Sequence, residues 1–315
     1  MPRLSLPTPP TAPMTSAKAS DSLQTSAATP SVRVVGVLTC FNRKPMTLAC
    51  LEALHASANE ANVELQMIVV DDASSDGTAA AVRAGFPEVE VIDGSGALFW
   101  NRGMHEGYGL AMQRPADYYL WINDDSHLVP DAIGRLLRQS VQLRQEQGKP
   151  VIIVGAMAER GSGRITYGGR VAGSSLRRFN YQMVWSPTEP MRCDVIEGNC
   201  VLIPREIALR VGNLDPVFEH AMGDTDYGLR AGRAGFGCFV SAGVIGYCSD
   251  NPVSGTHSDT SLPLRKRWRL LLGRKGLPVR SWLHFTRRHG GPLWPLYFSW
   301  PYARLLWSGL RGSRA

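Results

Sequence analysis

The sequence lacks several features that would place it in a common class. It contains no uninterrupted apolar run of about 18 residues, so no membrane-spanning helix is predicted. Its six cysteines form no CxxC pair and no zinc-type spacing, which indicates the reduced thiols of a cytosolic protein and no structural zinc. No GxGxxG motif follows a strand pattern, which argues against a dinucleotide-dependent dehydrogenase.

Acidic residues are missing from the C-terminal end. After Asp259 there is no Asp or Glu, whereas twelve Lys and Arg residues occur from Arg265 to Arg314. The net charge of the whole chain is only +7, so the part before this tail is mildly acidic. A basic appendage on an acidic core predicts contact with a polyanion, either a nucleic acid or an anionic membrane.

The first 31 residues are rich in Pro, Ser, Thr and Ala and show no clear periodicity. They lack the apolar centre of a signal peptide, and their composition predicts disorder. We therefore expect three parts, which are a disordered segment 1–31, a folded domain 32–260 and a basic, aromatic, helical tail 261–315.

Between residues 32 and 158, apolar runs of strand length alternate with helical patterns. Strands are predicted at 32–39, 65–70, 89–92, 118–122 and 151–158, and helices at 45–55, 78–84, 102–112 and 130–145. Further along, 161–185 is Gly-rich with short strand-like pieces, and helices are predicted at 204–211 and 224–234. The alternation is typical of an α/β fold whose mostly parallel sheet carries helices on both faces.

Polar and acidic residues follow three of these strands, at the edge where open α/β sheets bind ligands. The segments are Thr39-Cys40-Phe41-Asn42, Asp71-Asp72 and Asn123-Asp124-Asp125. Asp71 and Asp72 could equally serve as turn or helix caps, because Ser74, Ser75 and Gly77 follow them. Adjacent carboxylates at 124 and 125 repel each other unless a cation or a donor-rich ligand compensates, which favours a divalent metal.

A further acidic group begins the helix predicted at 224–234. Asp224 and Asp226 could merely complement the positive end of the helix dipole, which stabilises by about 0.3–1 kcal/mol per charge. That role does not explain why a loop with Glu219 and His220 leads into them. We therefore treat these two aspartates as candidate catalytic residues.

Taken in order, these segments resemble glycosyltransferase family 2. The resemblance spans about residues 32–250, and its most specific part is the Asp-Asp-x-Ser-x-Asp-Gly-Thr stretch from Asp71 to Thr78. The other matching segments are Thr39 to Asn42, Asn123-Asp124-Asp125, Val211-Gly212-Asn213-Leu214-Asp215 and Gly223 to Gly235. The resemblance implies an inverting enzyme with a GT-A fold in which 32–260 is the catalytic domain.

The resemblance also implies roles for individual residues. Thr39 and Asp72 would contact the nucleotide base, Asp124 the ribose, and Asp125 the Mg²⁺ or Mn²⁺ that bridges the diphosphate. Asp224 would be the general base, with Asp226 beside it orienting the acceptor or the helix start. The remaining candidates are Phe41, Asn42 and Arg102 for the nucleotide, and Trp100, Glu197, Gly198 and Asn199 for the donor and acceptor pocket. A metal suits this chemistry, because it neutralises charge on the departing nucleoside diphosphate, and a carboxylate takes the proton of the attacking hydroxyl.

Three positions depart from the family pattern or stay open. Where relatives place a histidine in the metal shell, this chain has Cys248, which is a poor ligand for a hard cation. His257 is the alternative candidate, although a loop histidine is more often simply solvated. Gly223 stands where relatives often carry an acid. The segment 94–103 would cover the donor with Arg102 near phosphate, or it is a Gly-rich turn with a core tryptophan.

The tail interleaves its basic residues with aromatic ones, a pattern that suits peripheral binding to an anionic membrane surface. The alternative is a helical appendage that packs on the catalytic domain. The run 292–307 is too apolar for a nucleic-acid groove, so we expect no nucleic-acid partner. On the membrane interpretation the enzyme lies on the cytoplasmic face of the cell membrane.

The expected donor is a nucleotide-diphospho-sugar, with a UDP- or dTDP-sugar favoured over other nucleotides. The expected acceptor is a glycan or lipid-linked saccharide of a surface-polysaccharide pathway. Two rival functions remain. A sugar-phosphate nucleotidyltransferase would open with a Gly-rich loop, but Gly36 is the only glycine near the first strand. A catalytically degenerate, membrane-associated nucleotide-sugar-binding protein would not need the four aspartates at 72, 124, 125 and 224.

Overall fold

The computed structural model describes residues 31–173, 178–250 and 252–312. By its internal contacts the chain divides into Met1–Pro30 and a compact unit Ser31–Ala315, and the described residues all belong to the second. The segment 1–31, for which the sequence predicts disorder, lies outside the described residues except for Ser31.

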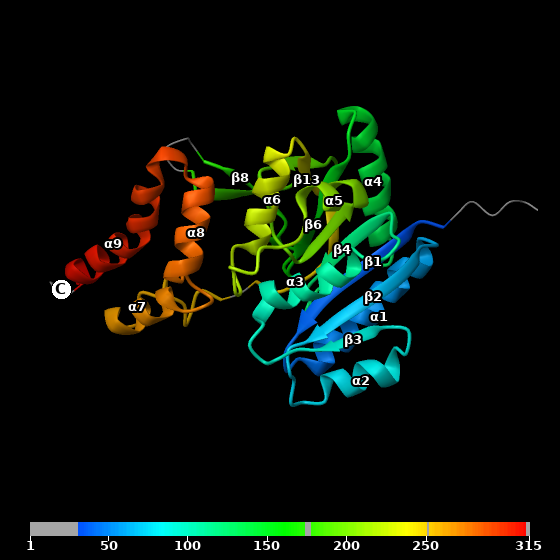
Figure 1. The fold of residues 1–315 in the computed structure, drawn as a ribbon, viewed down its shortest axis with the longest axis horizontal. Coiled ribbons are helices and arrows are strands. Elements are labelled where there is room, and N and C mark those ends of the chain that lie inside the picture. Colours follow the sequence, from blue (N-terminus) through cyan, green and yellow to red (C-terminus); the bar gives the residue numbers. More distant parts are fainter. Residues whose placement is uncertain (1–30, 174–177, 251, 313–315) are drawn as a thin grey trace, which may run out of the picture. The chain divides into compact units, whose positions relative to one another are not determined.

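Four strands of the first half form a parallel sheet. They are β1 (Arg33–Cys40), β2 (Glu64–Asp71), β3 (Glu90–Asp93) and β4 (Tyr118–Ile122), in the spatial order β4-β1-β2-β3. β1 pairs with β2 along its whole length and with β4 along half of it. Because β1 lies in the middle, the loops that follow β1, β2 and β4 come together at one edge of the sheet (Figure 1).

The second half extends the same sheet beyond β4. β12 (Cys200–Pro204) is inserted antiparallel between β4 and β6 (Val151–Ala158), and β13 (Gly237–Tyr247) then pairs parallel with β6. The shorter strands are β5 (His127–Leu128), β7 (Ile165–Tyr167) and β10 (Met191–Cys193) in this sheet, and β11 (Val195–Ile196), β8 (Gly169–Ala172) and β9 (Tyr181–Val184) in a second one. Because β12 runs antiparallel to β4 and begins opposite Ile122, the loop that precedes β12 lies at the carboxyl edge of β4.

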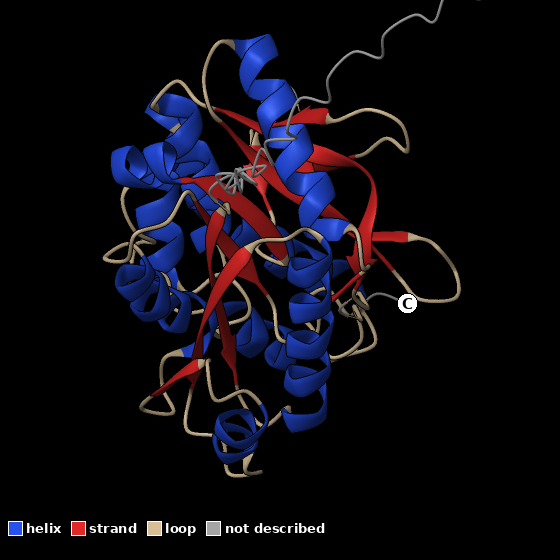
Figure 2. Ribbon diagram, turned by 90° about the vertical axis from the view of Figure 1, so that its right-hand side faces the viewer, coloured by secondary structure: helices blue, strands red, loops and turns tan. Residues whose placement is uncertain are grey.

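Helices cover both faces of the central sheet (Figure 2). One face carries α1 (Lys44–Glu60), α2 (Thr78–Gly85) and α4 (Ala132–Gln147), and the other carries α3 (Phe99–Ala111), α5 (Arg205–Val211) and α6 (Gly223–Arg233). Alternate residues of β1 serve the two cores, since Val34 and Leu38 pack with α1 while Val35 and Val37 pack with α3. Burial on both faces explains why β1 is a continuous apolar run.

Helix α3 lies very close to the sheet because two of its residues are glycines. A Cβ atom at Gly103 would lie 2.4 Å from the Thr39 hydroxyl oxygen, and one at Gly107 would lie 2.6 Å from Val37. The absence of side chains lets the helix rest on β1 and β2, which brings its N-terminus to the carboxyl edge of the sheet.

The C-terminal segment forms α7 (Leu264–Leu272), α8 (Val279–His289), a short 3₁₀ helix η2 (Gly291–Leu293) and α9 (Trp294–Gly312). Trp282 and Phe285 of α8 form a third apolar cluster with Phe218, which precedes α6. α9 leaves several large apolar side chains exposed, including Trp300 and Trp307. None of the helices in the described part of the chain has the length and apolar character needed to cross a bilayer.

The predicted fold class, a mostly parallel α/β sheet with helices on both faces and a C-terminal helical appendage, is confirmed. The strands and helices predicted in the first half all occur, with ends that differ by a few residues. Strands β12 and β13 were not predicted. The boundary after residue 260 stays a prediction, and α8 packs directly on the core.

Candidate active site

The loops after β1 and β2 are fastened to each other through Asn42. Its φ of 53° is unusual for a residue other than glycine, and such strain often occurs at functional sites. The backbone N–H of Asn42 donates to Ser74 Oγ at 2.8 Å, and its side-chain oxygen accepts from the backbone N–H of Ser75 at 2.7 Å. Asn42, predicted to contact the nucleotide, thus holds the rim of the site in shape.

Asp72 anchors the loop that leads into α3. Its buried carboxylate accepts hydrogen bonds from the backbone N–H groups of Gly96 at 2.7 Å, Leu98 at 3.0 Å and Phe99 at 2.9 Å. A negative charge at this position is favourable, because the N-terminus of a helix presents unpaired N–H groups. The residue lies at the predicted edge of the sheet, and its oxygens are occupied by the backbone.

Asp124 and Asp125 follow β4 and share one cation. Arg43 Nη1 lies 3.1 Å from Asp124 Oδ1 and 2.8 Å from Asp125 Oδ2. Asp124 is buried, and burial raises the pKa of its carboxyl to about 6, although Arg43 opposes the rise. The arginine offsets the mutual repulsion that the sequence predicts for this pair.

Cys248 lies beside Asp125, where its thiol donates to Asp125 Oδ1 at 3.4 Å. Burial and the neighbouring carboxylate raise the pKa of this thiol to about 12, so it stays protonated. Within residues 31–173, 178–250 and 252–312, there is no group of three or more His, Cys, Asp or Glu side chains that could hold a metal ion. The protein oxygens available to a hard cation here are those of Asp124 and Asp125.

Asp224 stands in the first turn of α6 and is partly buried. Its Oδ2 accepts the backbone N–H of Gly198 at 3.0 Å, and its Oδ1 accepts the backbone N–H of Thr225 at 2.7 Å. Burial raises the pKa of the carboxyl above its ordinary value, while these N–H groups lower it. Two fixed donors therefore orient a carboxylate of increased basicity.

Trp100 connects the acidic pair after β4 with Asp224. Its indole N–H donates to Asn123 Oδ1 at 2.7 Å, next to Asp124 in the chain. The same ring covers Gly198, where a Cβ would lie 2.3 Å from the ring, and Gly198 donates to Asp224. A series of contacts thus connects Asn123 at the end of β4, through the ring of Trp100 and Gly198, with the carboxylate of Asp224.

Comparison with known protein families identifies the family of the chain. The family model of glycosyl transferase family 2 matches residues 37–198, about half of the chain. The chain belongs to this family. A search of curated proteins gave no match. Since it belongs to glycosyl transferase family 2, the protein is a glycosyltransferase. The resemblance predicted from the sequence is confirmed.

Two solved structures have a similar fold. The mannosyltransferase PcManGT from Pyrobaculum calidifontis, solved with GDP-Man and Mn²⁺, matches with a TM-score of 0.52 and 16% identity over 89% of this chain and 74% of that one. GalNAc-T7, solved with UDP, GalNAc and Mn²⁺, matches with a TM-score of 0.52 and 12% identity over 77% of this chain and 48% of that one. At these identities the likeness establishes the GT-A fold alone.

Asp226, the second candidate catalytic residue of the family 2 chain, lies in a different environment from Asp224. It is fully buried, and its carboxylate accepts from Arg230 Nε at 2.8 Å, Arg288 Nη1 at 2.9 Å and His289 Nε2 at 2.8 Å. These donors lower its pKa to about 2 in spite of its burial. Through these contacts Asp226 joins α6 to α8, and the role expected for it, orienting the acceptor or the helix start, stays a prediction.

Three other predicted site residues lie at the edge of the sheet with differing exposure. The Thr39 hydroxyl donates to the carbonyl of Val70 at 3.1 Å and lies under Gly103, so it faces α3. Phe41 is 53% exposed at the end of β1 and offers a free ring face. Arg102 donates from Nε to the carbonyl of Pro216 at 3.1 Å.

His257 lies away from Asp125, at a cavity formed by the C-terminal helices. Burial lowers the pKa of its imidazole. Its carbonyl accepts from Arg267 Nε of α7 at 2.9 Å. The role of His257 in the metal shell stays a prediction.

The loop before β12 combines structural and site positions. Glu197 is engaged by the small sheet, because it accepts Arg170 Nε at 2.8 Å and the backbone N–H of Gly168 at 3.0 Å. Asn199 is buried and donates to Cys248 Sγ at 3.4 Å, while its carbonyl accepts from Ser126 Oγ at 3.1 Å. Of the three predicted residues in this loop, Gly198 has the direct contact with Asp224.

Arg43 and Arg274 were not predicted as site residues. Arg43 directly follows Asn42 at a strand end, and that position was a signal that could have identified it. Arg274 belongs to the loop between α7 and α8, donates to Glu219 Oε2 at 2.7 Å, and places its guanidinium 4.3 Å from the centroid of the Phe99 ring. The C-terminal segment therefore reaches the loop that Asp72 anchors.

Proposed function

We propose that the protein transfers a sugar from a nucleotide-diphospho-sugar, a UDP- or dTDP-sugar before others, to a hydroxyl of a glycan or lipid-linked saccharide, with inversion. The observation that carries the proposal is the Asp224 carboxylate, held by Gly198 and Thr225 and joined through Trp100 to the acidic pair after β4. On this proposal Asp224 is the base on one side of a bound sugar. The acidic pair lies on the other side, where the charge of the departing diphosphate is compensated.

Asp224 would take the proton of the attacking acceptor hydroxyl. A general base must have its carboxylate fixed within hydrogen-bond reach of that proton, and its efficiency increases as its pKa approaches the working pH. The two backbone donors meet the first requirement, and the effect of burial on the pKa of Asp224 is in the direction of the second. A single in-line displacement by this hydroxyl inverts the sugar carbon.

A divalent cation, Mg²⁺ or Mn²⁺, fits the donor set of Asp124 and Asp125. Such ions are commonly bound by one or two carboxylates and completed by substrate phosphates and water, so a larger cluster is not required. Asp125, whose side chain is 30% exposed, would hold the ion, and Asp124 and Arg43 would adjust the charge beside it. When bound, the ion neutralises the departing diphosphate.

The donor nucleotide would bind between the loop after β1 and the start of α3. The exposed ring of Phe41 suits stacking on a base, and the loop fixed by Asp72 presents the backbone beside it. Arg274, stacked on Phe99, brings positive charge from the tail toward this pocket.

Exposed Trp300, Leu306 and Trp307 on α9, together with the basic tail, support peripheral binding to an anionic membrane. On this proposal the enzyme works on the cytoplasmic face of the cell membrane, in the synthesis of a surface polysaccharide. No nucleic acid takes part.

Calorimetric titration with UDP, GDP, CDP and dTDP, each with and without Mn²⁺, tests the proposal. We expect one nucleotide to bind and to bind more tightly with Mn²⁺. Absence of binding to all four by the folded protein would contradict the proposal and favour a degenerate scaffold. Transfer assays with the sugar conjugates of the bound nucleotide then identify the donor.

A further inference from the structure

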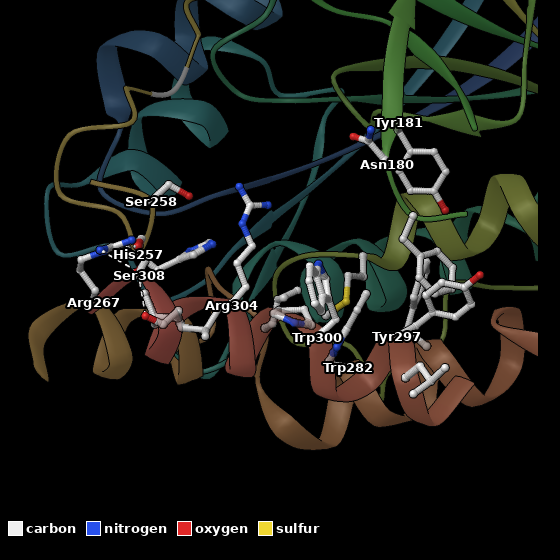
Figure 3. A pocket seen from close by; sticks show the side chains of 18 of the residues that line it. Asn180, Tyr181, His257, Ser258, Arg267, Trp282, Tyr297, Trp300, Arg304 and Ser308 are labelled. Carbon is white, nitrogen blue, oxygen red and sulfur yellow. Dashed lines mark hydrogen bonds between the residues drawn. The ribbon is translucent and has the colours of Figure 1, made fainter. Parts of the chain in front are cut away.

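A large cavity lies between the C-terminal helices and the catalytic core (Figure 3). Its volume is about 1120 Å³, at the upper end of sites that enclose small ligands. α7, α8 and α9 form one side of the cavity. Phe179 and Tyr181 of the β8–β9 region and Met222 and Thr225 at the start of α6 form the other.

The wall of this cavity is mainly aromatic and aliphatic. Leu296 and Trp300 of α9 line it and are 66% and 65% exposed, so most of their surface is left uncovered by the described residues around them. Trp282 and Phe285 of α8 close the floor. Bare apolar surface of this extent marks a binding site more often than a free surface.

The charges around the cavity have one sign. Arg267 and Arg304 line it, and its lining contains no Asp or Glu among the described residues. Arg267 is engaged with the His257 carbonyl, whereas the Arg304 guanidinium projects from α9 into the open space and has no hydrogen bond or ion pair with another described residue (Figure 3). The cavity therefore suits a ligand that is apolar along its length and carries an anionic group.

The cavity shares Thr225 with the surroundings of Asp224 in the candidate active site. Thr225 lines it, and the backbone N–H of Thr225 donates to Asp224 Oδ1 at 2.7 Å. Met222, another lining residue, has a φ of 76° at the turn into α6. A residue that lines the cavity therefore contacts the proposed base directly.

We propose that this cavity binds the apolar chain and the phosphate group of a lipid-linked saccharide acceptor, with the saccharide reaching Asp224. The inference rests on the proposed function. Three observations favour this occupant, which are the contact of the lining residue Thr225 with Asp224, the exposed apolar wall and the guanidinium of Arg304 that projects into the cavity. Arg304 would pair with the phosphate, and Leu296 and Trp300 would pack on the chain.

Titration of the full chain with farnesyl phosphate, below its micelle concentration, tests the proposal. We expect saturable binding that inorganic phosphate does not reproduce. Leu296→Glu, which places a charge in the apolar wall, should weaken it at least about tenfold. Arg304→Gln should weaken the binding of farnesyl phosphate by about five- to tenfold, because a charge-assisted hydrogen bond is lost. The binding of farnesol should be unchanged.

Leu306→Glu is the matched control, because Leu306 is exposed on the same helix and does not line the cavity. It should leave farnesyl phosphate binding unchanged. If Leu296→Glu and Leu306→Glu weaken farnesyl phosphate binding equally, the lipid lies on the exposed face of α9, where a bilayer would also lie. That result would overturn the proposal. No binding of farnesyl phosphate would overturn it as well.

Nucleotide titration separates this inference from the proposed function. If a nucleotide binds with Mn²⁺ but farnesyl phosphate does not, the cavity proposal is wrong and the transferase proposal stands. If farnesyl phosphate binds with the expected variant pattern and no nucleotide binds, the proposed function is wrong and the cavity remains a lipid site.

Discussion

Each carboxylate at the candidate site has a different kind of partner. Asp72 accepts backbone N–H groups, Asp124 and Asp125 share the Arg43 guanidinium, and Asp224 is held by two backbone donors. These partners suit the different roles proposed for them, a loop anchor, a cation site and a base, although all four residues are aspartates. The chemistry of the site is therefore decided by surroundings and not by residue type.

Replacement of Asp224 by Asn should lower kcat by about 10²- to 10⁴-fold, because the amide cannot accept the proton of the acceptor hydroxyl. Its oxygen can still accept the Gly198 N–H, so nucleotide affinity should stay within about twofold and the fold should be retained. Steady-state kinetics and calorimetry check the two parts. Asp131→Asn, an exposed aspartate before α4, is the control, and a similar kcat in both variants would contradict the role of Asp224.

Replacement of Arg43 by Gln should tighten the binding of Mn²⁺ alone by about tenfold, since it removes a cation beside Asp124 and Asp125. Calorimetric titration with Mn²⁺ measures the change. Arg83→Gln removes the same charge from a surface ion pair with Asp93 and should have no effect. Weaker Mn²⁺ binding in Arg43→Gln would mean that the carboxylates do not receive the ion.

At the scale of elements, glycines set how closely the helices approach one another. Gly223 begins α6, and a Cβ there would lie 1.6 Å from Asn101 Oδ1 of α3. Asn101 is itself fixed, because its side-chain amide donates to the carbonyls of Asp215 and Phe218 at 2.9 and 2.8 Å. This contact leaves no room for a side chain at position 223.

Gly223→Ala should therefore destabilise the protein by about 1–3 kcal/mol, because Asn101 must move. Gly232→Ala is the matched control, since it lies in the same helix with nothing within 4 Å of the added Cβ. That change should stabilise by about 0.5–1 kcal/mol through helix propensity. Urea unfolding of both variants checks the prediction, and equal effects would show that the Asn101 contact is unimportant.

The sequence predicted the elements that are continuous in pattern. β1, β2 and β4 are apolar runs buried on both faces, and polar residues at their ends identified the functional edge. β12 was not predicted, because its short apolar run Cys200–Pro204 follows a loop and its antiparallel pairing with β4 depends on tertiary structure. β13 contains three glycines and shifts register against β6, which hides its strand pattern.

The contacts at the candidate site could not be predicted from the sequence, because they too depend on tertiary structure. Nothing in the local sequence indicates that Arg43 pairs with residues about 80 positions later. Likewise Asp224 and Asp226 stand two residues apart and look equivalent, but the helix directs one to Gly198 and the other to α8. The order of the motifs along the sequence was enough to predict the family. The environment of each residue depends on contacts that only the structure shows.

At the scale of the whole molecule, the charge cluster around Asp226 unites the core and the tail. Asp226→Asn should destabilise the protein by about 3–5 kcal/mol at neutral pH, because it leaves Arg230, Arg288 and His289 without their buried partner. Guanidinium unfolding measures this loss. A variant as stable as the wild type would contradict the structural role of the cluster.

The same cluster predicts a pH dependence. The pKa of Asp226 is lowered to about 2 in the folded protein, below its unfolded value of about 3.9, so the unfolded state binds more protons in this window. Its stabilisation is present above about pH 4 and is lost as the pH falls toward 2. The difference in stability between wild type and Asp226→Asn should shrink over that range, and a constant difference would contradict the assignment.

The basic, aromatic tail should bind vesicles that contain anionic lipid and not neutral ones. Each basic residue near the surface contributes about 1 kcal/mol, and salt screens it over about 10 Å at 0.1 M. Sedimentation with vesicles should show binding that weakens as salt increases and in Leu306→Glu, which places an acid on the exposed side of α9. Binding that is independent of lipid charge would exclude this role of the tail.

The Arg43 bridge has a consequence for the order in which substrates arrive. While it spans Asp124 and Asp125, a free cation meets two carboxylates whose charge is already half offset, and it gains less by entering. A nucleotide that carries its own cation offers phosphate oxygens to the same guanidinium, so Arg43 can change partners without leaving any charge uncompensated. The kinetics should therefore be ordered, with the metal–nucleotide complex as one entering species.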